Sequence, residues 1–192
     1  FEPDRLAIWL YAGLLDVVEQ LYLSHHADKT PSLLPVRRSL QMIIDNMREH
    51  NGIYQMLSAI RDPQKRRSSS NSRVAIAIDS IGFGQFLGFP AQDQMDMALC
   101  GILGGLSDST DPIESVRPLF RYSGLGDSAL GMIMMLHDAR ASRQGKQSAL
   151  AGKILMAVEA YHQVLDDNPT SAVSKLIYQM STGGVEGVDS GV

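Results

Sequence analysis

Cysteine is nearly absent from this chain of 192 residues, which contains a single one, Cys100. One cysteine cannot form an internal disulfide, and a chain without disulfides fits a reducing compartment. Cys100 lies within an apolar run, where a buried thiol is usually inert. We therefore interpret it as a small core residue in preference to a reactive nucleophile.

Long apolar segments and an excess of basic charge are also lacking. No apolar run approaches the roughly 18 to 20 residues of a membrane span, and no basic segment precedes a short apolar one at the start. The net charge of -4 gives no electrostatic basis for binding nucleic acid or anionic lipid. We expect a cytoplasmic protein with no membrane partner and no nucleic-acid partner.

The motifs of common enzyme classes are missing as well. The chain has no GxSxG, no HExxH, and no GxGxxG or Walker-type loop after a strand. The glycines of GFGQFLG (82–88) lie within a helical period, which favours close helix packing over phosphate binding. The methionines of MIMM (132–135) favour an adaptable core over a ligand surface.

What the chain does have is helical periodicity over most of its length. Residues 4–23 repeat apolar side chains at i, i+3, i+4 and i+7, which is the pattern of an amphipathic helix. No strict alternation of apolar and polar residues occurs, so we predict an all-α domain. Further helices are expected at 36–48, at 51–60, from 73 to a stop at Gly88 and Pro90, and at 91–106, 112–122, 126–138, 147–166 and 170–180.

The polar stretch RDPQKRRSSSNSR (61–73) is the strongest internal boundary. We interpret it as a solvated loop. The alternative is a phosphate-binding patch formed by Lys65, Arg66, Arg67 and Arg73. The length and the 44% hydrophobic content suit one domain. The chain begins without Met and ends without a helix-ending signal, so we expect it to be part of a longer protein.

Three segments follow one another in an informative order: SNSRVAIAIDSIGFGQFLGF, ILGGLSD (102–108) and AGKILMAVEAYHQVLDDNP (151–169). In this order they resemble the HD-GYP family, the bacterial all-α phosphohydrolases that cut cyclic di-GMP at a cluster of metal ions. The resemblance runs from about residue 36 to the C-terminal end. It implies a single domain, 1–192, with an HD-domain-like bundle of about eight helices, in which N-terminal helices (1–60) precede a degenerate core (70–192).

The residues that define the family's metal site are replaced in this sequence. Ser70 stands where the resemblance places the first metal-binding His. The family's Leu-Leu-His-Asp-Ile-Gly-Lys corresponds to ILGGLSD, so Gly104 and Gly105 replace the His-Asp pair and Asp108 replaces the lysine. The side chain of glycine is a single hydrogen atom, which cannot coordinate a metal ion. The resemblance therefore implies an inactive relative with no catalytic residue, no bound metal and no cofactor.

The later family motifs are retained only in part. Asp111 precedes Pro112 at the family's His-Pro position, His137 and Asp138 stand near its His-His-Glu position, and the Gly-Tyr-Pro loop is missing. Glu159 replaces a metal-binding Asp. An alternative interpretation is that Asp111, His137, Asp138 and Glu159 gather and hold a single cation.

Three functions remain open at this point. The first hypothesis is a catalytically inactive regulatory or protein-interaction module of a bacterial signalling protein, whose partner is another protein or a neighbouring signalling domain. The alternatives are a cyclic dinucleotide sensor that binds without turnover, and a metal-dependent phosphohydrolase with an altered site. The helix at 4–23 either covers the core of its own chain or packs against a second copy in a homodimer.

Overall fold

The computed structural model describes residues 3–27, 29, 31–60, 69–106, 128–143 and 145–167. These ranges contain helices and no strand, so the all-α prediction is confirmed for them. The helices expected at 112–122 and 170–180 lie outside the described residues. The described helices are α1 (Pro3–His26), α2 (Leu34–Ala59), α3 (Ser69–Phe86), α4 (Ala91–Leu103), α6 (Ser128–Arg143) and α7 (Leu150–Asp167).

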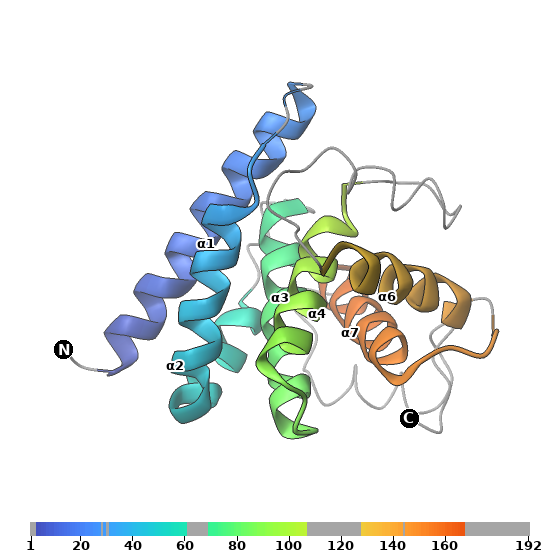
Figure 1. Ribbon diagram of the computed structural model, residues 1–192. Coiled ribbons are helices and arrows are strands. Elements are labelled where there is room, and N and C mark those ends of the chain that lie inside the picture. Colours follow the sequence, from blue (N-terminus) through green and yellow to red (C-terminus); the bar gives the residue numbers. More distant parts are fainter. Residues whose placement is uncertain are drawn as a thin grey trace.

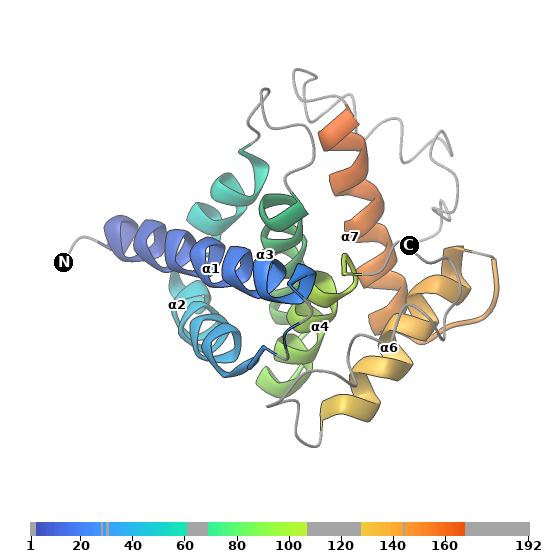
Figure 2. The same cartoon turned by 90° about the horizontal axis from the view of Figure 1, so that it is seen from above.

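The helices form a bundle around α3 and α4 (Figure 1). α1 and α2 pack together on one side of this pair, and α6 and α7 pack together on the other. Seen from above, α1 crosses the bundle and reaches the end of α4 (Figure 2), where the Tyr22 hydroxyl donates a hydrogen bond to the carbonyl of Ile102 at 2.7 Å. The C-terminal end of α4 is therefore enclosed by other helices.

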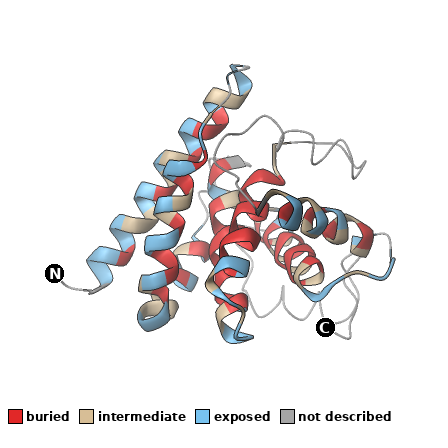
Figure 3. Ribbon diagram, viewed as in Figure 1, coloured by how far each residue is buried: buried red, intermediate tan, exposed pale blue. Residues whose placement is uncertain are grey.

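The centre of the core is α4, which is buried without interruption from Gln94 to Leu103 (Figure 3). A helix that is apolar around its circumference needs neighbours on every side. Its contact with α3 depends on Gly101, because a Cβ there would lie 2.9 Å from Cγ2 of Ile76 and 3.2 Å from the amide nitrogen of Ala77. The small residue permits the two central helices to approach closely.

The predicted stop of α3 is confirmed in its geometry. Gly88 has a φ of 74°, a conformation that side-chain-bearing residues rarely adopt. The amide of Gly88 donates to the carbonyl of Gln85 at 3.1 Å, and the amide of Phe89 donates to that of Gly84 at 2.8 Å. These two bonds form a Schellman motif, which ends the helix and satisfies its last carbonyls.

The break predicted between the helices at 36–48 and 51–60 is found in the structure. α2 runs through it with a kink at His50, where φ is -129° and ψ is 29°. Asn51 and Gly52 are poor helix formers, which weakens the sequence signal here. Buried residues continue beyond the kink to Tyr54, which is fully buried.

The start of α3 was predicted too late. The helix begins at Ser69, inside the polar stretch that was interpreted as a loop. Residues with hydroxyl groups are favourable at helix N-termini because their oxygens accept hydrogen bonds from the free backbone amide groups there. Residues 61–68 lie outside the described residues.

The prediction that no segment reaches the length of a membrane span was wrong for α1. By length and composition alone, Asp4–His26 is long and apolar enough to cross a membrane. This is weak evidence, because core helices and signal sequences share that composition. In the structure, α1 contributes Ala7, Leu14, Val18, Leu21 and Tyr22 to the core.

Candidate functional site

Gly104 and Gly105, which the resemblance aligns with a His-Asp pair, follow the end of α4, and Gly104 lies beside Glu159 of α7. The amide of Gly104 donates to the carbonyl of Cys100 at 2.8 Å and closes the last turn. A Cβ on Gly104 would lie 3.2 Å from Oε1 of Glu159. The structure thus brings together three of the positions that the sequence singled out.

Glu159 is held by two arginines. Its side chain is only 5% exposed. Nη1 of Arg73 on α3 donates to Oε1 at 2.9 Å, and Nη2 of Arg143 on α6 donates to Oε2 at 2.6 Å. Both carboxylate oxygens are therefore engaged by charge-assisted hydrogen bonds from different helices.

Arg73 also fills the space beside Gly105. A Cβ on Gly105 would lie 2.8 Å from Cδ of Arg73 and 2.8 Å from the hydroxyl oxygen of Tyr22. Real Cβ atoms essentially never come this close to other heavy atoms. A side chain at Gly105 would therefore require Arg73 and Tyr22 to shift.

A third arginine, Arg140 on α6, completes the cluster. Its Nη2 donates to the carbonyl of Gly104 at 3.3 Å, at the helix end where the backbone dipole is negative. Burial lowers the pKa of the Arg140 guanidinium; the Glu159 carboxylate raises it, and the neighbouring Arg143 and Arg73 lower it. We call Arg73, Arg140, Arg143 and Glu159 the arginine cluster.

The structure places three further predicted site residues, Ser70, His137 and Asp138, on α3 and α6. Ser70 is buried on α3, one turn before Arg73. His137 is 60% exposed on α6, with Nδ1 3.7 Å from Oδ1 of Asp138. Asp138 accepts a hydrogen bond from the amide of Ala149 at 3.1 Å, just before α7 begins. Asp108 and Asp111 lie outside the described residues.

The single-cation hypothesis gains no support from the members that can be seen. Across the described ranges, no three His, Cys, Asp or Glu side chains come close enough to hold a metal ion. His137 lies on an exposed face, and the oxygens of Glu159 are bound to arginines. The fourth member, Asp111, is outside these ranges.

The arginines were the part of the site that sequence reasoning missed. Arg73 was placed in a solvated loop, with a phosphate-binding patch of Lys65, Arg66, Arg67 and Arg73 as the alternative. It belongs to α3 and pairs with Glu159. The other three residues of that patch lie outside the described residues. One signal was present: Glu159 falls on the apolar face of its helix, and a buried carboxylate needs a cationic partner.

Cys100 is a core residue, as expected. Its side chain is fully buried, and its thiol donates to the carbonyl of Met132 at 3.5 Å. Burial raises the pKa of the Cys100 thiol well above its usual range, and the nearby charges of Asp96 and Glu159 raise it further. A thiol in this state is a poor nucleophile.

A second polar group, Ser58, Asp79 and His162, joins α2, α3 and α7. The Ser58 hydroxyl lies 2.7 Å from Oδ1 of Asp79, and Nε2 of His162 lies 2.8 Å from Oδ2. A nucleophilic triad would need the histidine between the hydroxyl and the carboxylate, whereas here the carboxylate is in the middle. His162 is fully buried. The arrangement is that of a structural tie between three helices.

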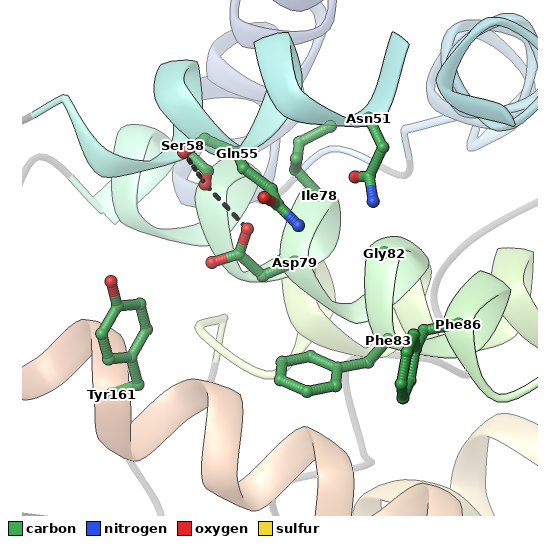
Figure 4. Close-up of a pocket in the computed structure, with 9 residues that line it drawn as sticks. All are labelled: Asn51, Gln55, Ser58, Ile78, Asp79, Gly82, Phe83, Phe86 and Tyr161. Carbon is green, nitrogen blue, oxygen red and sulfur yellow. Dashed lines mark hydrogen bonds between the residues drawn. The ribbon is translucent and has the colours of Figure 1, made fainter. Parts of the chain in front are cut away.

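A cavity of about 430 Å³ opens beside this tie (Figure 4). α2 contributes Asn51, Gln55 and Ser58 to its wall, and α3 contributes Phe83 and Phe86. Polar groups and aromatic rings therefore face the same space from different helices. Sequence reasoning did not anticipate this cavity, because its walls come from segments far apart in the chain.

Comparisons with protein-family models, with curated proteins and with solved structures found no match for this chain.

Proposed function

We propose that this chain is a catalytically inactive HD-GYP-like domain that serves as a cytoplasmic regulatory or protein-interaction module of a bacterial signalling protein. The observation that carries the proposal is the pairing of both Glu159 oxygens with Arg73 and Arg143. By the resemblance, Glu159 stands at a metal-binding position. Here two guanidinium groups donate hydrogen bonds to the carboxylate oxygens that a metal ion would need as ligands.

Electrostatics strengthens this argument. A divalent ion about 4 Å from one guanidinium is repelled by roughly 8 kcal/mol at an effective dielectric of 20. Three arginines gather around the one carboxylate of the cluster. Gly104 and Gly105 supply no side-chain ligand to offset this repulsion. The residues of the arginine cluster therefore favour a fixed ion pair over a metal centre.

The placement of the replaced positions supports the family resemblance. Gly104 and Glu159 are far apart in sequence, yet a Cβ on Gly104 would touch the carboxylate. α3, α4 and α7, which carry the resembling segments, all pack on one another. A metal site shared by these helices in a related enzyme would fall at the arginine cluster.

The partner surface that we propose is the outer face of α1, paired with the same face of a second copy. Trp9 is 75% exposed and Ile8 is 50% exposed, although both belong to a strongly apolar helix. Large exposed apolar side chains that cluster on one element mark interaction sites. If the α1 helices of two copies pack about a two-fold axis, each copy covers the exposed apolar face of the other.

A sensor that binds a cyclic dinucleotide without turnover is the second candidate. It is not favoured at Gly105, because Arg73 occupies the space there. A phosphohydrolase with an altered metal site would in turn require Glu159 to leave its two arginines. The inactive module needs neither rearrangement.

Hydrolysis of cyclic di-GMP with Mn²⁺ or Fe²⁺ supplied tests the proposal. We expect turnover no higher than that of the metal ions alone. Turnover that exceeds this background by orders of magnitude, and is lost in Glu159→Gln but retained in Glu49→Gln, would overturn it. Glu49 is a suitable control because its side chain is 84% exposed.

A further inference from the structure

The arginine cluster carries more positive than negative charge. Arg73, Arg140 and Arg143 contribute three guanidinium groups, and Glu159 is the one carboxylate of the described structure that acts on Arg140. The carbonyl end of α4, to which Arg140 donates, adds about half a negative charge. An excess of roughly one and a half positive charges therefore remains among the described residues.

The three guanidinium groups are close enough to repel one another. Burial lowers the pKa of Arg140, and the charges of Arg143 and Arg73 lower it further, whereas Glu159 raises it. Like charges that are held together cost free energy unless counter-charges offset them. An anion bound at the arginines would offset this repulsion.

The guanidinium groups also have donors to spare. Each carries several N–H groups in a planar fork. In the described structure, Arg73 and Arg143 each donate one hydrogen bond to Glu159, and Arg140 donates one to the carbonyl of Gly104. The Arg140 bond is 3.3 Å long, which exceeds the roughly 2.7–3.2 Å that is usual. Donors thus remain for the oxygens of an anion.

Solvent reaches the arginines but hardly reaches the carboxylate. The side chain of Arg143 is 38% exposed and that of Arg73 is 24% exposed, whereas that of Glu159 is 5% exposed. Arg140 and Arg143 are three residues apart on α6, so their side chains share one face of that helix. An anion from solvent can therefore contact the arginines while Glu159 stays in place.

Charge and geometry favour a phosphate group as this anion. A phosphate monoester carries about −1.5 to −2 charges at neutral pH, which matches the excess of the cluster. Guanidinium forks bind phosphate oxygens through pairs of parallel hydrogen bonds. A phosphodiester carries only about one negative charge and matches the excess less well.

We propose that the arginine cluster binds a dianionic phosphate group, either inorganic phosphate or the phosphomonoester of an organic ligand, through Arg73, Arg140 and Arg143. The phosphate lies on the solvent side of the arginines, and Glu159 keeps both of its hydrogen bonds. This inference rests on the proposed function in one respect, namely that no metal ion binds Glu159. It does not depend on the family resemblance.

Calorimetric titration of the EDTA-treated protein with inorganic phosphate, AMP and adenosine tests the proposal. The titration is done at pH 8, where the phosphate group is mostly dianionic, and at physiological ionic strength set with sodium chloride. Phosphate, AMP or both should bind at millimolar concentration or below, and adenosine should not. Tighter binding of phosphate indicates the free ion as the ligand, and tighter binding of AMP indicates a phosphomonoester.

Matched variants locate the binding. Arg140→Gln and Arg143→Gln should each weaken it about tenfold, the equivalent of 1.4 kcal/mol, because each removes charge-assisted hydrogen bonds. Arg48→Gln, at an exposed arginine of α2, should leave it unchanged.

The parent protein alone can overturn the proposal, so the test does not depend on the folding of a variant. Absence of binding by both phosphate and AMP would do so, as would AMP binding that adenosine matches. Binding that both Arg140→Gln and Arg143→Gln retain would also overturn it. Because EDTA removes metal ions, phosphate binding does not report on a metal at Glu159, and the metal content of the protein tests the proposed function separately.

Discussion

Glu159 is the residue on which the arginine cluster depends. It is the single carboxylate that the cluster's arginines share, and it is nearly buried. Removing one partner of a buried ion pair leaves the others uncompensated, at a cost of about 3–5 kcal/mol when burial is complete. Because Arg143 is 38% exposed, solvent offsets part of this loss.

We therefore predict that Glu159→Gln lowers the free energy of unfolding by about 2–3 kcal/mol. Urea denaturation followed by circular dichroism measures this. Glu49→Gln, at an exposed position, should change it by less than about 0.5 kcal/mol. Equal effects of the two variants would show that Glu159 has no special role.

Gly105 and Arg73 compete for the same space, which predicts a coupling between them. Gly105→Ala should cost about 1–3 kcal/mol, because the new methyl meets Arg73 and Tyr22. In an Arg73→Ala background the cost should fall by at least about 0.5 kcal/mol. A double-mutant cycle in urea measures this coupling.

A matched glycine variant separates crowding from helix propensity. A Cβ on Gly52 would meet no heavy atom within 4 Å, so Gly52→Ala should stabilise the protein by about 0.5–1 kcal/mol. If Gly105→Ala is as harmless as Gly52→Ala, Arg73 does not hold the place described for it.

The Cys100 thiol offers a test through its raised pKa. Below that pKa the thiol is protonated, and because burial raises the pKa in the folded state, thiolate forms only at a more alkaline pH than in the unfolded chain. At pH 8 the folded protein should be unreactive towards a thiol reagent such as DTNB, and one thiol should appear in denaturant. Fast labelling of the native protein would contradict the described core.

At the scale of helices, most of the described boundaries could be predicted from the local sequence. The periodicity of residues 4–23 and the stop at Gly88 both follow from local rules and were found correctly. The break near His50 was also found correctly, because the poor helix formers Asn51 and Gly52 follow it. The early start of α3 was hidden by its polar first turn.

The exposed face of α1 leads to a prediction about assembly. Trp9→Glu should convert a dimer to a monomer, because a charge would be buried in the paired apolar face. Light scattering after size-exclusion chromatography measures the mass. A monomeric parent protein, or a dimer that tolerates Trp9→Glu, would contradict pairing through α1. Sedimentation with vesicles would indicate a membrane instead of a second copy.

At the scale of the whole molecule, the all-α class could be predicted from the sequence, because helical periodicity is sufficient to indicate it. Only part of the candidate site could be predicted from the sequence. Gly104, Gly105 and Glu159 could be singled out, but Arg73, Arg140 and Arg143 come from two helices whose positions depend on the complete fold. The cavity between α2, α3 and α7 was hidden for the same reason.

The most direct test of the central claim is the metal content of the purified protein after incubation with Fe²⁺, Mn²⁺ or Zn²⁺ and gel filtration. If arginines hold the place of the metal centre, elemental analysis should find far less than one equivalent of each. One equivalent or more in the parent protein, lost on Glu159→Ala, would show that Glu159 binds a metal and would contradict the inactive module.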